Sequence, residues 1–279
     1  MTRDLFVPSI RFTKMHGLGN DFVVLDEFAG FSDAPVFVDP ALASRLADRH
    51  LGIGCDQLLL VGPPRLLGAD ARMEIWNPDG SHAEMCGNGI RAIALYLHDH
   101  GPSGLRERTS YAIETGAGLL SVSLHGRQVK VDMGAPRFAA TAPERLETPV
   151  GNFDFWEVSM GNPHAVIFVE KLGEVPLEKW GPVIERHPRF EKRTNVEFVE
   201  VVSSSKVRVK VWERGAGATL ACGTGACASA VAAILSDQAR QVLDVELPGG
   251  VLRLEWDRGA ASPVWMTGPA VEVFSGRTR

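Results

Sequence analysis

The sequence has no long apolar run and no excess of positive charge. No stretch reaches the roughly 18–20 consecutive apolar residues of a membrane-spanning helix. The formal net charge is −5 and the isoelectric point is near 5.9, so the basic character typical of nucleic-acid binding is missing. The opening residues, MTRDL, do not resemble a secretory signal peptide. We therefore expect a cytoplasmic protein with no membrane and no nucleic-acid partner.

Cysteine is also scarce, with four residues in a chain of 279. In the cytoplasm these are expected to be thiols rather than a disulfide framework. No Cys-x-x-Cys pair is present, and His82 and His164 do not complete a zinc-ligand spacing, so we expect no metal site. The glycine-rich stretches lack the Gly-Lys-Ser/Thr of a phosphate-binding loop. A catalytic or a packing role is left for the thiols.

The composition is otherwise ordinary, with 45% hydrophobic and 23% charged residues, as expected for one large or two average domains. One motif occurs twice: CGNGIRA (Cys86–Ala92) and CGTGACA (Cys222–Ala228) lie about half the chain length apart. The segments directly before them, RMEIWNPDGSHAEM and RVKVWERGAGATLA, also align. A weaker echo pairs GNDFVVLDE from Gly19 with GNPHAVIFVE from Gly161. We infer two structurally equivalent halves.

Each half shows the same order of predicted elements: two strands, a helix, two strands, the cysteine motif with its helix, and closing strands. Helices are expected from Pro40, with Asp39 as N-cap, after Cys86 to about Asp99, over about Leu177–His187, and after Cys222 to about Ser236. Strand pairs joined by short turns, with single helices between them, indicate an α+β fold.

We place the N-terminal half at residues 1–132, completed by a C-terminal strand at about 267–279. The C-terminal half covers residues 133–266. The tract APRFAATAPERLETP at residues 135–149 is interpreted as the junction between them. If the halves face each other, the two cysteine motifs would meet in one cleft, and that cleft is the expected active site.

A cysteine before a helix has a chemical use. The first N–H groups of a helix lack intrahelical partners and, with the helix dipole, bind anions such as carboxylates. The same field lowers the pKa of a thiol from about 8.5 to roughly 3.5–7.5. Thiols on opposite faces of one carbon could exchange its proton, the thiolate removing it and the thiol returning one. Cys86 and Cys222 therefore indicate two-base racemisation or epimerisation.

Simpler interpretations exist for each thiol. A lone buried cysteine is usually an apolar filler, and this is what we expect of Cys55 and Cys227, which lie outside the matching turns. Two thiols could also form a redox switch, in a sensor or a binding module without catalysis.

Six stretches in order, KMHGLGNDF, GIGCDQ, NPDGSHAEMCGNGIRA, GNPHAV, RTNVEF and ERGAGATLACGTGACA, resemble the diaminopimelate epimerase family over nearly the whole chain. The resemblance implies two pseudo-symmetric α+β halves, each a mostly antiparallel sheet wrapped around a central helix. It also implies a cofactor-independent enzyme that interconverts LL- and meso-diaminopimelate in lysine and peptidoglycan precursor biosynthesis.

The resemblance also implies roles for individual residues. Cys86 and Cys222 would be the acid/base pair, and His164 and Glu213 would tune their protonation. Substrate would be bound by Asn20, Gln57, Asn77, Gly87, Asn88, Asn162, Asn195, Glu213, Arg214, Gly223 and Thr224. The family also implies a homodimer, with Phe274 at the dimer contact.

Two related families fit less well. In proline racemase and hydroxyproline epimerase the first cysteine is followed by Gly-His, whereas here Asn88 stands in the His place. The asparagine-rich set and Arg214 also suit a substrate with a second amino-acid head better than a cyclic amine. The phenazine-biosynthesis isomerases lack the cysteine pair altogether.

Overall fold

The computed structural model describes residues 9–28, 37–138 and 140–278. The opening MTRDL stretch and Ala139 of the expected junction lie outside the described residues. The chain divides into two compact units. Unit 1 is formed by Met1–Gly17, Asp21–Val129 and Ala270–Arg279, and unit 2 by Leu18–Asn20 and Lys130–Pro269.

The first part of the chain and its C-terminal strand supply unit 1. The elements are β1 (Arg11–Gly17), β2 (Asn20–Asp26), α1 (Pro40–Ala47), β3 (Gln57–Gly62), β4 (Ala71–Trp76), β5 (His82–Ala83), α2 (Gly87–His100), β6 (Ser110–Thr115), β7 (Gly118–His125), β8 (Gln128–Asp132) and β18 (Val271–Arg277). Both β2 and β8 contain a boundary between the units.

Most of unit 2 comes from Lys130–Pro269. Its elements are β9 (Glu144–Thr148), β10 (Gly151–Ser159), β11 (Pro163–Phe168), the 3₁₀ helix η1 (Leu172–Glu174), α3 (Leu177–Glu185), β12 (Asn195–Ser203), β13 (Lys206–Glu213), β14 (Gly217–Thr219), α4 (Gly223–Leu235), β15 (Val242–Leu247), β16 (Gly250–Glu255) and β17 (Trp265–Pro269).

The strands of the two units pair in the same way. In unit 1, β2–β3 and β4–β6 are parallel, and β3–β4, β4–β5, β6–β7 and β1–β18 are antiparallel. In unit 2, β11–β12 and β13–β15 are parallel, and β12–β13, β13–β14, β15–β16 and β9–β10 are antiparallel. This repeated order confirms the α+β class and the two structurally equivalent halves.

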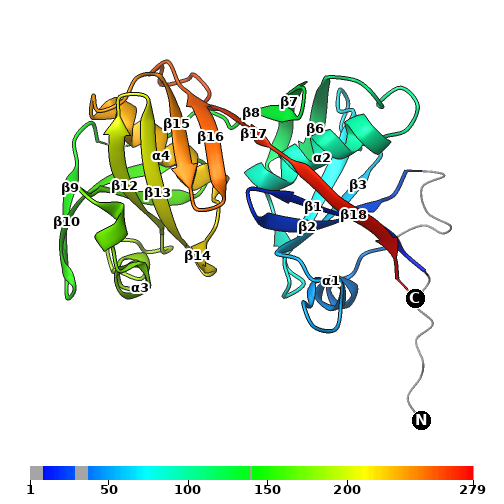
Figure 1. The fold of residues 1–279 in the computed structure, drawn as a ribbon, viewed down its shortest axis with the longest axis horizontal. Coiled ribbons are helices and arrows are strands. Elements are labelled where there is room, and N and C mark those ends of the chain that lie inside the picture. Colours follow the sequence, from blue (N-terminus) through cyan, green and yellow to red (C-terminus); the bar gives the residue numbers. More distant parts are fainter. Residues whose placement is uncertain (1–8, 29–36, 139, 279) are drawn as a thin grey trace, which may run out of the picture. The chain divides into compact units, whose positions relative to one another are not determined.

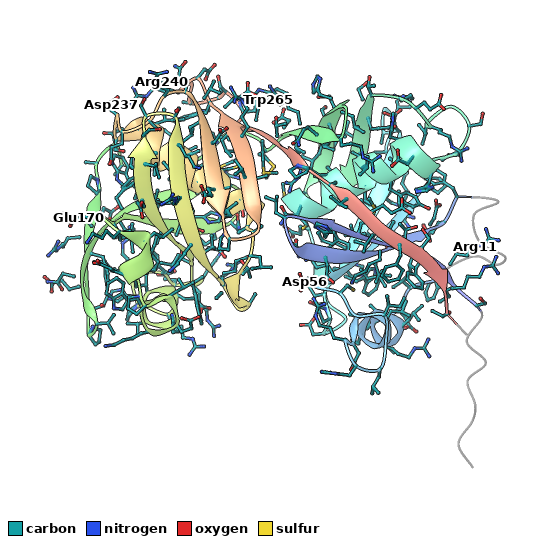
Figure 2. All side chains as sticks on the ribbon, in the orientation of Figure 1. Arg11, Asp56, Glu170, Asp237, Arg240 and Trp265 are labelled. Atoms are coloured by element: carbon teal, nitrogen blue, oxygen red, sulfur yellow. The ribbon has the colours of Figure 1, made fainter. Side chains whose placement is uncertain are left out.

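One helix is buried at the centre of each unit. Helix α2 packs against β1, β3, β6, β7 and β18, and its residues from Gly87 to Leu97 are buried (Figure 1). Helix α4 packs against β10–β13, β15 and β16 and is buried along almost its whole length. Small and apolar residues on every side of α4, as in CASAVAAIL, make this central position favourable. Polar side chains such as Glu170 and Arg240 lie at the surface of unit 2 (Figure 2).

The helix predicted from Pro40 begins as expected, because the Asp39 carboxylate accepts the Leu42 N–H at 2.7 Å. It ends at Ala47 rather than at His50, where the apolar pattern from Pro40 ends, since the Asp48 carboxylate accepts the N–H groups of His50 and Leu51 and turns the chain. The tract interpreted as the junction contains β9, whose Leu146 is buried in the core of unit 2.

Candidate active site

Cys86 caps the central helix of unit 1. It lies just before α2 in an extended conformation, with φ −144°, and its sulfur accepts the N–H of Gly89 at 3.3 Å. The thiol is half-buried. A β-carbon at Gly89 would lie 3.4 Å from this sulfur and 3.3 Å from Leu59 Cδ2, so the glycine allows close packing of the turn. The thiol therefore lies within the positive field of the helix N-terminus.

Cys222 occupies the same position in unit 2. Its φ is −118°, and its sulfur accepts the N–H of Gly225 at 3.3 Å, the same length as in unit 1. Only 6% of Cys222 is exposed. The repeated sequence motif thus folds into the same thiol-capped helix twice, each with Gly-Asn or Gly-Thr in its first turn. The backbone N–H groups of a helix start are suited to bind a carboxylate.

In unit 1, a buried cation lies beside the Cys86 turn. The Arg91 side chain is fully buried and donates to the Gly87 carbonyl at 3.0 Å and to Asn88 Oδ1 at 2.9 Å. Arg91 thus holds in place the two residues that follow the thiol.

A second polar pair in unit 1 joins two strands. Gln57 is the first residue of β3, and Asn77 directly follows β4. The Gln57 side chain donates to Asn77 Oδ1 at 3.0 Å. Asn77 Nδ2 in turn donates to Ser81 Oγ at 3.0 Å. Two of the predicted substrate ligands are therefore in direct contact.

Unit 2 contains a chain of hydrogen bonds that ends at its thiol. The Cys222 sulfur lies 3.5 Å from Thr224 Oγ1, which accepts from Asn162 Nδ2 at 3.2 Å. Asn162 Oδ1 lies 3.0 Å from His164 Nε2, and His164 Nδ1 lies 2.8 Å from Glu197 Oε1. Residues from β11, β12 and α4, with the turn before β11, thus form one connected polar cluster.

Asn195 and Arg214 are also brought together in unit 2. Asn195 is the first residue of β12, accepts the backbone N–H of Arg214 at 2.9 Å, and donates to the Pro163 carbonyl at 2.9 Å. The Arg214 guanidinium donates to the Lys192 carbonyl at 3.1 Å and is exposed. An exposed guanidinium on a fixed backbone can bind a carboxylate through two parallel hydrogen bonds.

The expectation that a helix N-terminus lowers the thiol pKa is wrong for Cys222. Burial, with the nearby carboxylates of Glu213 and Glu197, raises its pKa well above the usual value. The Thr224 hydroxyl and the Gly225 N–H oppose this shift but are outweighed. Burial likewise raises the pKa of Glu213, although Thr219 donates to its carboxylate at 2.6 Å. Unit 2 by itself therefore favours the protonated thiol.

The remaining predicted residues lie as follows. Asn20 begins β2 directly after Gly19, which has a φ of +85°, just as Asn162 follows Gly161, which has a φ of +98°. These left-handed conformations explain the glycine before each asparagine. Phe274 lies in β18, with half its surface exposed.

The other two thiols are buried. Cys55 lies in the hydrophobic core of unit 1, where burial raises its pKa to about 11, and Cys227 lies inside α4. Neither caps a helix.

Sequence reasoning missed Glu197, Arg91 and Thr219. Glu197 and Arg91 lie inside quoted motifs, RTNVEF and CGNGIRA, and a charged residue within an otherwise apolar run was the available signal. Thr219 gave no such signal. Among the described residues, no three His, Cys, Asp or Glu side chains are grouped so as to hold a metal ion.

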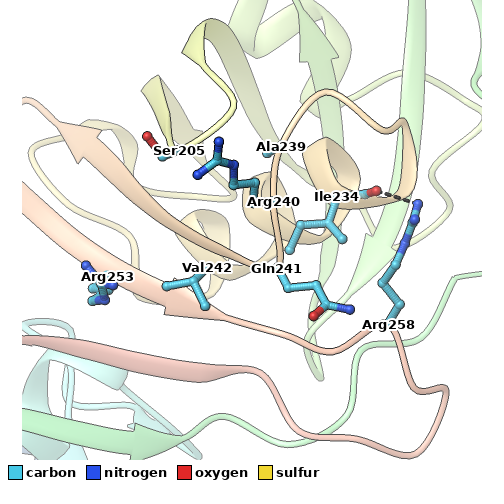
Figure 3. A pocket seen from close by; sticks show the side chains of 8 residues that line it. All are labelled: Ser205, Ile234, Ala239, Arg240, Gln241, Val242, Arg253 and Arg258. Carbon is cyan, nitrogen blue, oxygen red and sulfur yellow. Dashed lines mark hydrogen bonds between the residues drawn. The ribbon is translucent and has the colours of Figure 1, made fainter.

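A surface hollow in unit 2 lies at the other end of α4 (Figure 3). It is lined by Ser205, Ile234, Ala239, Arg240, Gln241, Val242, Arg253 and Arg258. Ile234 is in the last turn of α4, about 18 Å along the helix from Cys222. Arg258 in this hollow binds the Ile234 carbonyl at 2.6 Å and Asp237 at 2.8 Å. The hollow is therefore separate from the thiol.

Comparison with known proteins assigns the chain to a family. The sequence model described as diaminopimelate epimerase matches residues 12–139 and 156–273. The chain belongs to the diaminopimelate epimerase family. A diaminopimelate epimerase of Desulforudis audaxviator is 48% identical, over 96% of this chain and 99% of its own length. Diaminopimelate epimerase 1 of a Nostoc species is 46% identical over the same shares. The motifs that suggested the family are thus supported over nearly the whole chain.

Solved structures show the same fold at low sequence identity. A PhzF-family phenazine biosynthesis protein of Bacillus anthracis has a TM-score of 0.72 at 17% identity, covering 98% of this chain and 100% of its own. A hydroxyproline epimerase of Agrobacterium vitis has a TM-score of 0.74 at 15% identity, covering 98% of this chain and 91% of its own. The diaminopimelate epimerase family therefore shares its architecture with enzymes of other names. In the described part of this chain, no helix has the length and apolar character to cross a membrane.

Proposed function

We propose that this chain interconverts LL-2,6-diaminopimelate and meso-diaminopimelate, a step of lysine and peptidoglycan precursor biosynthesis. The observation that carries the proposal is the matched pair of thiol caps, with Cys86 and Cys222 each bound to a helix N–H at 3.3 Å. Family membership supports the substrate, since relatives above 45% identity are named diaminopimelate epimerases.

The proposed mechanism uses the two thiols as acid and base on opposite faces of the α-carbon. One thiolate takes the α-proton, the electron pair of the C–H bond passes into the carbanion, and the other thiol donates its proton to the opposite face. The backbone N–H groups at the start of each helix, at Gly87-Asn88 and Gly223-Thr224, stabilise the negative charge that grows on the adjacent carboxylate. The reaction then exchanges a carbon-bound proton without a cofactor.

Cys222 is the proposed proton donor of the resting enzyme. Burial raises its pKa, and the neighbouring carboxylates of Glu213 and Glu197 raise it further. His164 and Glu213 are the proposed groups that tune the two thiols, because His164 belongs to the polar chain that ends at Cys222 and Glu213 lies beside it.

The polar ends of the substrate are assigned to the amide and charged side chains of both units. Glu213 suits an ammonium group, and Arg214 suits a carboxylate. The proposed substrate ligands are Asn20, Gln57, Asn77, Gly87, Asn88, Asn162, Asn195, Glu213, Arg214, Gly223 and Thr224. The two functional halves are proposed to be residues 1–132 together with about 267–279, and residues 133–266.

The enzyme is further proposed to be a cytoplasmic homodimer that binds no membrane. Half of the Phe274 surface is exposed on β18, and Val271 and Val273 on the same strand are 40% and 55% exposed. An exposed apolar strand of this kind is suited to contact with a second copy. Sedimentation of the purified chain, compared with Phe274→Glu, tests this: the variant should shift toward monomer.

The decisive test is solvent deuterium exchange. Purified protein is incubated with LL-diaminopimelate in D₂O without added cofactor, and deuterium at the α-carbon is followed together with formation of the meso isomer. Deuterium incorporation with epimerisation is expected. Binding without exchange would instead support a module that only binds, and exchange on proline but not on diaminopimelate would move the chain to the cyclic amino-acid racemases.

A further inference from the structure

A fully buried pair lies behind the polar chain of unit 2. His164 and Glu197 are both 0% exposed, and His164 Nδ1 lies 2.8 Å from Glu197 Oε1. Within the described residues, the other Glu197 oxygen is buried and makes no hydrogen bond. The carboxylate therefore depends on His164 alone for its compensation. Burying such ionisable groups costs desolvation free energy, so a gain in folding stability does not explain the pair.

Unit 1 shows that the fold does not need a polar pair at this place. Phe22 pairs with the first residue of β3, and His164 pairs with the first residue of β12, so the two are equivalent. Leu59 and Glu197 are each two residues further along those strands. Both Phe22 and Leu59 are fully buried. The same scaffold is thus packed with apolar side chains in one copy and with a histidine–carboxyl pair in the other.

The arrangement of acceptors fixes a proton on His164. Nδ1 faces a carboxyl oxygen, and Nε2 faces Asn162 Oδ1 at 3.0 Å. An amide oxygen only accepts, so Nε2 must carry a hydrogen. This holds whether the remaining proton of the pair is on Nδ1 or on Glu197. The carboxyl group contacts Nδ1 and so holds the ring with Nε2 facing Asn162.

From Asn162 onward, each hydrogen-bond donor of the chain points toward the Cys222 sulfur. Asn162 Nδ2 donates to Thr224 Oγ1 at 3.2 Å, which leaves the Thr224 hydroxyl hydrogen free to point at Cys222 Sγ, 3.5 Å away. A chain with this direction stabilises the thiolate that Cys222 becomes once it has donated its proton. Within unit 2, the titratable groups around it are Glu213 on β13, Glu197 on β12 and His164 on β11.

We propose that Glu197 is a positioning residue for the epimerisation: it fixes the His164 ring with Nε2 as donor and so sets the direction of the hydrogen-bond chain to the Cys222 sulfur. This role rests on the proposed function, because it serves proton transfer at Cys222. Glu197 itself touches neither the thiol nor the substrate in this assignment. It acts through His164, Asn162 and Thr224.

The test compares Glu197→Gln with Glu200→Gln. Both change a glutamate of β12 to its amide, but the Glu200 carboxylate binds the Leu172 N–H and Arg208, whereas that of Glu197 binds His164. In Glu197→Gln, kcat should fall about 10–100-fold, as for other residues that orient a functional histidine, with little change in KM. The pH profile of kcat should also move, whereas Glu200→Gln should match the wild type in all three.

The ring of His164 gives a readout that does not depend on activity. In protein labelled with ¹⁵N-histidine, the signals assigned by their loss in His164→Gln report which ring nitrogens carry hydrogen. The wild type should show a protonated Nε2, and Glu197→Gln should show a mixture of tautomers. A histidine that keeps the same nitrogen shifts in both proteins, or an unchanged pH profile with full kcat, would overturn the role of Glu197.

The experiments distinguish failure of the proposed function from failure of the role of Glu197. If the wild type does not epimerise diaminopimelate, the assigned reaction is wrong, yet the nitrogen shifts still decide whether Glu197 fixes the ring. If the wild type is active and Glu197→Gln equals Glu200→Gln, only the role of Glu197 is lost. Loss of folding in Glu197→Gln would be seen as a lowered melting temperature. In that case Glu197→Asp, which retains a carboxyl group, must restore part of kcat and the protonated Nε2, or the inference fails.

Discussion

The two units share a scaffold and differ in the groups around their thiols. Strand pairing, the central helix and the bond from sulfur to helix N–H are the same in both. Where unit 1 has Phe22 and Leu59, unit 2 has His164 and Glu197, and where unit 1 has Asn77, unit 2 has Glu213. The scaffold is thus maintained by backbone pairing and helix burial, while a few buried positions decide the electrostatics of each copy.

A further difference lies one turn into the central helices. Unit 1 places the buried Arg91 there, bound to the turn that follows Cys86, and unit 2 places the small Cys227. The charged side chains around the two thiols thus differ, with a buried arginine bound to the turn after Cys86 and the carboxylates of Glu213 and Glu197 near Cys222. Two thiols with identical surroundings would behave alike, so this asymmetry suits a pair in which one donates while the other accepts.

Removal of either thiol should give the largest effect. Cys86→Ala and Cys222→Ala should each lower the rate of epimerisation about 10²–10⁴-fold or more, because one face of the carbon then lacks its proton-transfer group. Turnover of LL-diaminopimelate followed by NMR measures the loss. Cys55→Ala and Cys227→Ala serve as matched controls, since both thiols are buried away from the helix caps, and they should stay active. Substantial turnover in both cap variants would contradict the two-thiol mechanism.

Giving unit 2 the apolar pair of unit 1 should separate stability from activity. Glu197→Leu alone leaves His164 buried without its partner and should lower the free energy of unfolding by about 3–5 kcal/mol. The double change Glu197→Leu with His164→Phe should restore it, to neutral or above wild type by about 1–4 kcal/mol. Urea unfolding measures both.

Activity of the same double variant completes the comparison. It should fold well and yet be nearly inactive, because the chain to Cys222 loses its histidine. A double variant that is less stable than the single one would show that the two units do not tolerate the same packing at this place.

The pattern of these differences shows which features the sequence could predict. The matching turns at Cys86 and Cys222 were recognised because glycine spacing and helix starts are local signals. The burial of Glu197 depends on β12 lying between β11 and β13, and the pairing of β12 with β11 spans the intervening helix α3. The raised pKa of Cys222 has the same origin, because burial raises it most and carboxylates from two separate strands raise it further. Short strands such as β5 and β14 gave no periodic signal to detect.

A second buried acid distinguishes unit 1. Burial raises the pKa of Asp26 to about 6, against the opposing hydrogen bonds from Phe28 and Tyr96. The equivalent residue in unit 2 is Phe168, since Asp26 pairs with Val61 and Phe168 pairs with Val199. Because the folded-state pKa lies above the unfolded value, the protonated acid contributes stability at low pH, and this contribution is lost as the pH rises from about 4 through 6.

Asp26→Asn should therefore stabilise unit 1 only where Asp26 is ionised. At pH 7.5 the free energy of unfolding should rise by about 3 kcal/mol relative to wild type, and at pH 4 the two proteins should be nearly equal. Asparagine can still accept from the Phe28 N–H and can donate to the Tyr96 hydroxyl. Urea unfolding at the two pH values tests this, and an equal difference at both would show that Asp26 does not titrate as described.

The smallest effect that we expect to measure is that of replacing Arg214. It follows Glu213 in unit 2, where unit 1 has Pro78 after Asn77, so unit 1 offers no cation at the equivalent place. Its backbone N–H is bound to Asn195 Oδ1 at 2.9 Å, which fixes the start of the side chain. Arg214→Lys should raise KM about tenfold with a smaller effect on kcat, because a point ammonium cannot replace a two-pronged guanidinium. Arg189→Lys, at an exposed surface pair with Glu157, is the control and should leave KM unchanged. An unchanged KM in Arg214→Lys would remove Arg214 from the substrate site and leave Glu213 as the charged group by which unit 2 differs from unit 1 at this turn.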